Sequence, residues 1–390
     1  MVTMLFPALL LIATSAQTGV TEVPFRTTDD AIIVDGMVNG HPVSCVFDTG
    51  FAGTVILNDS IDIGKPTGVM NLRDFVGTLQ ASTVKLTSFK LGNKTIDPKD
   101  KEAVQQPMSR LTDGYGVHCD GLMGLSAIKD YVTEINFQKK KFIFYPKSTD
   151  ITTRTPDNKK TFLAKMLMTG MSSIELTVVA NTGKKMTMAL DTGNAFYATT
   201  HKDVLQRVGL WGEQEAKFQK LSGVASGAVA SWAYRMKDVN IYGVPVKESY
   251  WDIIDAPSSS AEGDGTVGFG FLQNFNITFD YDRRRVWLEN WSGEVANKAP
   301  GDLGISAAYN QEIKRVMVYR VAPGSPADDA GIKAGDYLLS VGGADTGTLG
   351  FLELRKMMEG EVGSKVTVAT SRSGVLTRTE ITRKQLVNES

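Results

Sequence analysis

The pattern of apolar and polar positions predicts a chain built mainly from β-strands. Between about residues 20 and 290, short runs with apolar residues at every second position recur, and glycines or Asn-Gly pairs interrupt them. This pattern is typical of strands joined by tight turns. Helical spacing is confined to short pieces near 126 to 135 and 201 to 220. We therefore expect a mainly β architecture.

The pattern also repeats itself. A strand, a hairpin and a second strand that ends in an aspartate cover residues 32 to 50 and again 173 to 193. From Asp48 to Gly124 is 76 positions, and from Asp191 to Gly268 is 77. Similar middle segments and basic hairpins follow in both copies, so we expect two duplicated β lobes. The corresponding middle segments and closing hairpins lie at 83–97 and 234–248, and at 120–146 and 265–290.

The two repeats leave room for two further parts. An apolar N-terminal run that closes on small residues predicts a signal peptide over 1–16, and an uncleaved membrane anchor is the alternative. The stretch NKAPGD at 297 to 302 is typical of a linker. The predicted division is a signal peptide over 1–16, lobes over 17–150 and 151–297, and a separate C-terminal module over 301–388.

Composition narrows the range of partners. The 42 Lys and Arg residues nearly balance the 43 Asp and Glu residues, so charge gives no argument for a nucleic-acid or membrane-surface partner. The basic triplets 139–141 and 283–285 occupy equivalent hairpin tips, and we interpret them as solvated turns. No later segment is long and apolar enough to span a membrane, so we expect a periplasmic or secreted protein without a stable membrane span.

The cysteines and histidines do not indicate a metal or catalytic site. Cys45 and Cys119 can form a disulfide in an exported chain, or can be two buried free thiols. The three histidines are scattered and no metal-ligand spacing is present, so we expect neither a metal nor a cofactor.

The strongest candidate site is a pair of aspartates. Asp48 and Asp191 each follow an apolar strand within an Asp-Thr-Gly sequence, where a lone buried carboxylate would be costly. Two such groups that meet between duplicated lobes cannot both ionise easily, so the pair carries one proton over a range of pH. An ionised carboxylate can then activate a water while its protonated partner hydrogen-bonds a carbonyl oxygen. The supporting residues are Thr49, Gly50, Thr192 and Gly193.

These residues carry a resemblance to the pepsin-like and retropepsin-like aspartic proteases, and most closely to bacterial exported aspartyl proteases. That family has a hydrophobic-hydrophobic-Gly sequence later in each lobe, on a strand that threads a ψ-shaped loop. The resemblance covers roughly residues 25 to 295 and implies a bilobal fold that cleaves an extended polypeptide with an Asp48/Asp191 dyad. The matching ψ-loop positions are Leu122, Met123 and Gly124 in the first lobe and Val267 and Gly268 in the second.

Two features depart from that family pattern. Phe51 and Asn194 follow the Asp-Thr-Gly sequences, where the family usually has Ser, Thr or Ala. The pepsin-type flap tyrosine is missing from residues 51 to 100, and Phe75 is the candidate to cover the cleft instead. These departures keep open a catalytically inactive peptide-binding or scaffold protein as the alternative function.

The C-terminal module resembles a bacterial PDZ domain. Residues 316 to 343 give a strand, a Pro-Gly turn, a short helix that begins at Ser325-Pro326 and another strand, and residues 351 to 360 give a second helix. The resemblance implies that Leu303, Gly304 and Ile305 receive the terminal carboxylate of a peptide, which then adds as a strand. The alternative is a structural appendage. The combined hypothesis is an aspartic endopeptidase whose PDZ domain docks a substrate or partner.

Overall fold

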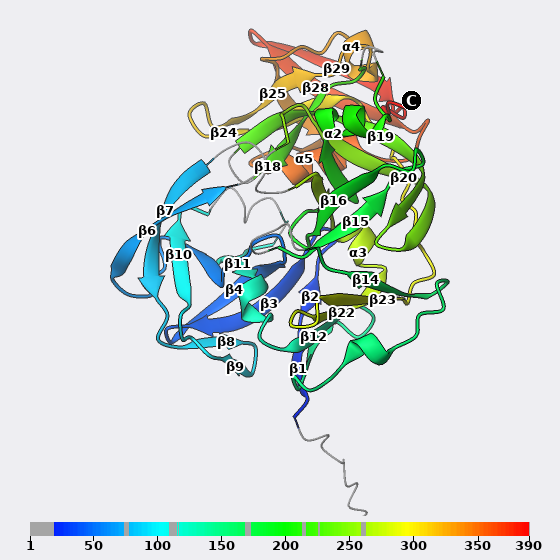
Figure 1. Cartoon of the computed structure of the whole chain (residues 1–390). Coiled ribbons are helices and arrows are strands. Elements are labelled where there is room, and N and C mark those ends of the chain that lie inside the picture. The colour runs from blue at the N-terminus through cyan, green and yellow to red at the C-terminus, as the bar shows by residue number, and fades with distance from the viewer. Residues whose placement is uncertain are drawn as a thin grey trace, which may run out of the picture.

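The structure is a computed structural model of the 390-residue chain. It describes residues 19–73, 78–108, 115, 117–167, 173–212, 216–224, 227–258 and 263–389. Strands dominate these residues, which confirms the mainly β prediction. Figure 1 shows the N-terminal strands in blue and cyan, a second group in green, and the C-terminal module in yellow to red at the top.

The N-terminal part of the chain forms a ten-stranded sheet, which we call the first β unit. Its strand order is β6-β7-β10-β5-β11-β4-β3-β8-β9, and β2 pairs with β3 beside this path. Asn39 and Gly40 join β3 to β4 with φ of 49° and 88°, as the Asn-Gly hairpin signal predicts. The strands are β2 (Arg26–Thr27), β3 (Ile32–Val38), β4 (His41–Asp48), β5 (Val55–Asn58), β6 (Pro66–Arg73), β7 (Thr78–Lys85), β8 (Phe89–Leu91), β9 (Lys94–Ile96), β10 (Glu102–Gln106) and β11 (Gly121–Gly124).

The second β unit is a seven-stranded sheet with the order β15-β16-β21-β17-β20-β19-β18. Strand β18 lies at its edge, because β19 is its only strand partner in the described sheet. Helix α2 (Lys202–Val208) follows β17 and ends at Gly209, whose φ of 79° suits a C-terminal cap. The strands are β15 (Glu175–Val179), β16 (Lys185–Leu190), β17 (Ala198–His201), β18 (Lys220–Val224), β19 (Gly227–Ile241), β20 (Val244–Ile254) and β21 (Gly265–Val267).

A third sheet joins the two halves of the chain. Its order is β1-β13-β12-β22-β23-β14, so β12 from the first half pairs antiparallel with β22 from the second. Both basic triplets lie at turns of this sheet, as predicted, between β12 and β13 and between β22 and β23. The strands are β1 (Thr21–Pro24), β12 (Val132–Asn136), β13 (Lys141–Tyr145), β14 (Thr161–Lys165), β22 (Phe275–Asp280) and β23 (Arg285–Asn290).

One local prediction is wrong. The helical piece expected near 126 to 135 is a short 3-10 turn, η2 (Leu125–Ala127), followed by strand β12. The β-branched residues of β12 favour an extended backbone, and pairing with β13 on one side and β22 on the other stabilises it. The remaining short helices of this part are α3 (Phe269–Leu272) and η3 (Ile151–Thr153).

The C-terminal module has its own sheet, with the order β24-β25-β26-β28-β29 and β27 paired to β26. Helix α4 (Pro326–Asp329) begins where the sequence predicts, because the Ser325 hydroxyl caps it by accepting from the Asp328 N–H. Helix α5 (Phe351–Met358) fits the predicted second helix. The strands are β24 (Ile305–Asn310), β25 (Arg315–Val321), β26 (Tyr337–Val341), β27 (Ala344–Asp345), β28 (Lys365–Arg372) and β29 (Val375–Thr382).

The cores follow the same division. One large cluster of buried side chains runs through both β units and the sheet that joins them. The C-terminal module has a separate cluster formed only by its own residues, including Leu303, Val318 and Leu354. The two β units are therefore stabilised by shared apolar packing, whereas the C-terminal module packs as a body of its own.

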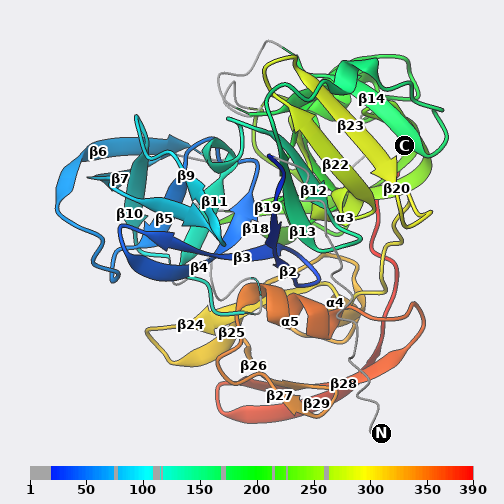
Figure 2. The same cartoon turned by 90° about the horizontal axis from the view of Figure 1, so that it is seen from below.

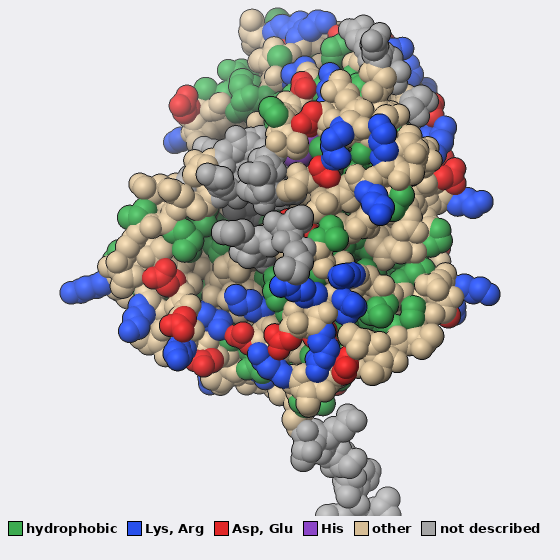
Figure 3. Space-filling model, in the orientation of Figure 1, with side chains coloured by type: hydrophobic (Ala, Val, Ile, Leu, Met, Phe, Trp, Pro, Cys, Tyr) green, Lys and Arg blue, Asp and Glu red, His purple; other side chains and the backbone are tan. Residues whose placement is uncertain are grey.

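The surface carries charges of both signs. On the face shown in Figure 3, Lys and Arg side chains lie interspersed with Asp and Glu side chains, in keeping with the near-zero net charge. Among the described residues, no helix is both long and apolar enough to cross a membrane.

Candidate functional site

Asp48 and Asp191 occupy equivalent positions in the two β units. Asp48 ends strand β4, and its parallel neighbour β11 places Gly124 directly beside it. Asp191 follows strand β16, and its N–H donates to the carbonyl of Val267 in the parallel neighbour β21. The predicted ψ-loop positions therefore lie next to the two aspartates.

The glycines of these strands leave no room for a side chain. A Cβ atom placed on Gly124 would come within 2.4 Å of the Gly53 carbonyl oxygen. One placed on Gly268 would come within 2.2 Å of the Phe196 carbonyl oxygen. Glycine is thus required because the loop after each aspartate crosses close to the strand.

The two loops are tied together by reciprocal threonine bonds. The Thr49 hydroxyl donates to the Leu190 carbonyl at 2.7 Å and accepts from the Thr192 N–H at 3.0 Å. In the mirror arrangement, the Thr192 hydroxyl donates to the Phe47 carbonyl at 2.8 Å and accepts from the Thr49 N–H at 3.1 Å. Both threonine side chains are fully buried, so these bonds fix the relative position of the two aspartates.

The aspartate side chains meet at this junction. A Cβ atom on Gly193 would lie 2.3 Å from Asp48 Cγ, and one on Gly50 would lie 2.6 Å from Asp191 Oδ1. Asp48 Oδ1 accepts from the Gly50 N–H at 2.8 Å, and Asp191 Oδ1 accepts from the Gly193 N–H at 2.9 Å. The structure thus places Asp48, Gly50, Asp191 and Gly193 close together.

Burial and hydrogen bonds act against each other on the Asp48 carboxyl. Removal from water raises its pKa above the usual range, and hydrogen bonds from Asp191, Gly50, Phe51 and Gly193 oppose that rise. Because Asp48 and Asp191 are hydrogen-bonded, the pair can hold one shared proton. It then presents a hydrogen-bond donor and a charged acceptor side by side.

Two neighbouring groups complete the site. The Asn194 amide donates to the Thr199 and Thr266 hydroxyls at 2.9 Å and 2.7 Å, so this departure from the expected sequence still fixes the loop after Asp191. The Tyr115 hydroxyl donates to the Gly193 carbonyl at 2.8 Å. Burial, with Asp48 and Asp191 nearby, raises the pKa of Tyr115. Sequence reasoning missed Tyr115, because no periodic pattern or motif in the sequence marks it.

Other predicted features have mixed outcomes. The predicted flap residue Phe75 lies outside the described residues.

Cys45 and Cys119 are both free and buried, which settles the disulfide question in favour of two thiols. Burial is the main cause that raises the pKa of the Cys119 thiol to about 11. No group of three or more His, Cys, Asp or Glu side chains that could hold a metal occurs within the described part of the chain.

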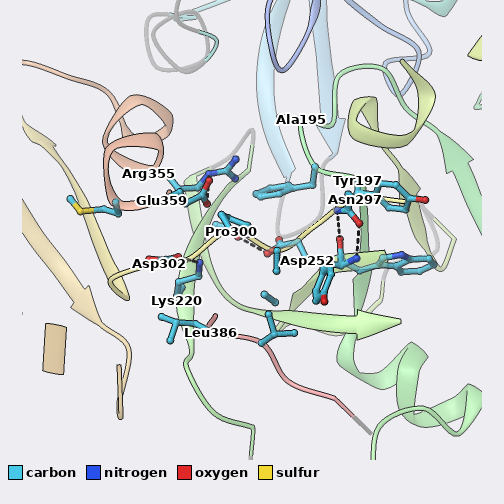
Figure 4. A pocket seen from close by; sticks show the side chains of 18 of the residues that line it. Ala195, Tyr197, Lys220, Asp252, Asn297, Pro300, Asp302, Arg355, Glu359 and Leu386 are labelled. Atoms are coloured by element: carbon cyan, nitrogen blue, oxygen red, sulfur yellow. Dashed lines mark hydrogen bonds and ion pairs between the residues drawn. The ribbon is translucent and has the colours of Figure 1, made fainter. Parts of the chain in front are cut away.

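A second candidate site lies in the C-terminal module. Helix α5 packs beside the edge strand β24, and we call the face between these two elements the groove. Leu303 is fully buried, Gly304 has φ of 84°, and Ile305 begins β24. A cavity of about 260 Å³ opens between this groove and the second β unit. Figure 4 shows Arg355 of α5, Glu359 at the C-terminal cap of that helix, Asp302 beside β24, and Lys220 of β18 around it.

Helix α5 also touches both β units, as its position beside them in Figure 2 indicates. The Arg355 guanidinium lies 4.7 Å from the ring centre of Phe196, in the loop that follows Asp191. Lys356 Nζ lies 2.6 Å from an Asp30 carboxylate oxygen in the first β unit. One helix therefore links the groove to both halves of the aspartate site.

Comparison with known proteins identifies the module. A family model for the PDZ domain matches residues 317–372, so the chain contains a PDZ domain. A carboxyl-terminal-processing protease of Picosynechococcus sp. is 34% identical over 94 residues, which is 24% of this chain and 22% of that protein. The periplasmic pH-dependent serine endoprotease DegQ of Escherichia coli is 32% identical over 130 residues, or 31% of this chain and 27% of that protein. The chain thus spans about a quarter of these relatives.

A solved structure gives a weaker likeness. The aspartic proteinase from Irpex lacteus is 13% identical, and the match covers 71% of this chain and 100% of that chain with a TM-score of 0.41. A similarity at this level carries no argument about fold or activity.

The predicted reaction type needs correction. The curated relatives are proteases, and DegQ is named as a serine endoprotease. These relatives contradict the prediction of an aspartic-type endopeptidase that uses an Asp48/Asp191 dyad. They support the predicted link to proteolysis and the PDZ domain. The two carboxylates do lie close together in the structure, but the position of a carboxyl pair does not by itself determine which reaction a protein catalyses.

Proposed function

We propose that this chain is an exported protein that binds polypeptides through its PDZ domain and acts in proteolysis. The observation that carries the proposal is the groove between the edge strand β24 and helix α5. An edge strand can accept a further strand through its backbone, and a loop at its start can receive a terminal carboxylate. Leu303, Gly304 and Ile305 are the residues of this loop.

A peptide-binding experiment tests the proposal. Fluorescein-labelled decapeptides that end in Ala, Val, Leu or Phe are titrated with residues 17–390, each as the free acid and as the C-terminal amide. We expect at least one free acid to bind in the micromolar range, with its amide at least tenfold weaker. Equal binding of acid and amide by every peptide would contradict a carboxylate-reading PDZ domain.

Peptide-bond hydrolysis with a serine nucleophile is a second candidate function, which the names of the curated relatives favour. A fluorophosphonate probe tests it directly, because it forms a stable adduct with an activated serine. Cleavage of unfolded casein together with one labelled serine in the tryptic map would support hydrolysis. Absence of both would leave peptide binding as the function.

We also propose a role for the aspartate pair in holding the polypeptide. In this proposal residues 17–150 and 151–297 are two lobes on a pepsin-like plan, after a signal peptide over 1–16 and before a PDZ domain over 301–388. The shared proton of Asp48 and Asp191 lets the pair donate to a carbonyl and accept from an N–H of an extended backbone. Loss of affinity for an unfolded polypeptide in Asp191→Asn, with unchanged binding of short PDZ peptides, would support this role.

A further inference from the structure

The groove of the PDZ domain is not open to solvent. Ser306 of β24 is only 5% exposed, although it lies outside the core of the C-terminal module and β25 is the only strand that pairs with β24 in the described sheet. The covering element is β18, the edge strand of the second β unit. The Leu221 N–H donates to the Ser306 hydroxyl at 3.0 Å, so β18 packs against β24, although the two strands belong to separate sheets.

The carboxylate loop is also occupied. The Gly304 N–H, which belongs to the loop expected to receive a peptide carboxylate, donates instead to Asp302 Oδ1 at 2.7 Å. The other oxygen of Asp302 accepts from Lys220 Nζ of β18 at 2.5 Å. The Asp302 side chain is 6% exposed and that of Lys220 is 21% exposed. A carboxylate and a neighbouring strand therefore already fill both parts of the site.

From these contacts we infer that the PDZ domain is occupied by its own chain, with β18 in the strand position and Asp302 in the carboxylate position. This inference rests on the proposed peptide-binding function. An incoming peptide C-terminus displaces β18 together with Lys220, and its carboxylate takes the Gly304 N–H from Asp302. The ligand class is an extended polypeptide with a free C-terminus.

The ion pair between Lys220 and Asp302 stabilises the state in which β18 covers the PDZ domain. Burial by itself would lower the pKa of Lys220, but the adjacent Asp302 outweighs it and the pKa is raised. Burial would likewise raise the pKa of Asp302, but Lys220 and the Gly304 N–H outweigh it and the pKa is lowered. Both groups thus stay charged near neutral pH, and separating them leaves buried charge without a partner.

Displacement of β18 leaves the PDZ domain attached. Asn388, near the end of the chain, donates its N–H to the Ala233 carbonyl at 2.9 Å and accepts from the Arg235 N–H at 2.8 Å. These backbone bonds hold the C-terminal segment on β19, and none of them involves β18.

Opening of the groove also affects the position of the aspartate pair. Arg355 of α5 stacks on Phe196, the Phe196 N–H donates to the Asn194 side chain at 3.0 Å, and the Asn194 N–H donates to Asp191 at 3.1 Å. A shift of α5 on peptide binding therefore acts on the loop that holds Asp191. The PDZ domain serves in this way as a switch that reports the presence of a polypeptide end.

The test compares Lys220→Met with Lys365→Met in residues 17–390. Lys365 lies on the PDZ domain in an exposed ion pair with Glu380, away from the groove, and so makes a matched control. The probes are the free-acid and amide decapeptides ending in Ala, Val, Leu or Phe, followed by fluorescence anisotropy. We expect Lys220→Met to bind the free acid about tenfold more tightly than wild type, and Lys365→Met to match wild type.

A second variant guards against a folding defect in Lys220→Met. Arg320→Gln removes a donor to the Gln219 carbonyl, which holds the start of β18 against the PDZ domain, without altering the groove. Tighter binding in this variant supports self-occupation. Equal affinity in wild type and both loosened variants overturns self-occupation and leaves peptide binding intact. If neither wild type nor any variant distinguishes acid from amide, the proposed function itself fails.

Discussion

The second β unit makes two contacts of opposite character. Toward the first β unit it presents the fully buried threonines, which exchange hydrogen bonds with the backbone inside a continuous apolar core. Toward the PDZ domain it presents charged side chains, and the PDZ domain keeps a separate core. The first contact can open only by exposing apolar surface, whereas the second can open by separating an ion pair. The comparison indicates that the aspartate site is held in a fixed position, whereas the PDZ domain can detach from the second β unit.

The largest effect is expected at the fixed contact. Thr49→Val keeps the side-chain volume but leaves the Thr192 N–H and the Leu190 carbonyl without their hydroxyl partner. Two buried polar groups left unpaired should lower the free energy of unfolding by about 4 kcal/mol. Urea denaturation measures this loss.

Thr377→Val is the control, because Thr377 is exposed on β29 of the PDZ domain. It should change stability by no more than about 0.5 kcal/mol. Equal effects of the two substitutions would show that the threonine junction is not the special contact described above.

The next effect concerns pH at the releasable contact. Asp252 lines the cavity beside the PDZ domain, and burial is the main cause that raises its pKa from 3.8 to about 6. The folded state therefore holds this proton more tightly than the unfolded state, and the associated stability is lost as pH rises from about 4 through 6. The difference corresponds to roughly 3 kcal/mol.

Asp252→Asn removes this titration, so the variant should be more stable than wild type at pH 7 and similar to it at pH 4. Urea denaturation at four pH values from 4 to 7 measures the two profiles. Asp238→Asn, on the exposed side of the same sheet, should follow the wild-type profile. Parallel profiles for wild type and Asp252→Asn would contradict the assignment of the proton to Asp252.

A smaller effect is expected where α5 meets the first β unit. Lys356→Met removes the ion pair with Asp30, whose side chain is 9% exposed, and so weakens the hold on the PDZ domain. Trypsin should then cut after the exposed Lys298 in the preceding linker about fivefold faster, since a pair of this kind contributes on the order of 1 kcal/mol. Mass spectrometry of timed digests gives the rate.

Lys365→Met again serves as the control and should leave the cleavage rate unchanged. An unchanged rate in Lys356→Met as well would mean that this ion pair does not help to hold the PDZ domain against the β units.

The smallest effect is the stacking of Arg355 on Phe196. A double-mutant cycle with Arg355→Lys and Phe196→Leu should give a coupling energy of about 0.5 kcal/mol, because a partly exposed cation contributes modestly over an aromatic ring. Urea denaturation of the four proteins measures it. Strict additivity would remove this link between α5 and the loop after Asp191.

The sequence contained much of the aspartate site. Strand alternation, the Asn39-Gly40 turn and the repeated Asp-Thr-Gly sequences are local signals, and they sufficed to predict that Asp48 and Asp191 meet. The same signals led to the wrong reaction type, because they describe the position of the carboxyl groups and not the chemistry of the protein. The start of α4 at Ser325-Pro326 was equally readable, because capping is a local property.

The contact between the PDZ domain and the second β unit could not be predicted from the sequence. Lys220 and Asp302 are separated by 82 positions, and neither lies in a motif. Their pairing depends on how two separately packed bodies dock, which no periodic pattern encodes. Tyr115 was missed for the same reason, since it reaches Gly193, 78 positions away, only through the tertiary fold.

The most direct test of the account is hydrogen exchange of residues 17–390 with and without a saturating free-acid peptide, read by mass spectrometry. The account predicts that amides of β18, residues 220–224, lose protection when the peptide binds. It also predicts that amides around Thr49 and Thr192 keep their protection, because the threonine junction stays closed. Unchanged protection of β18, or loss of protection at the threonine junction, would contradict it.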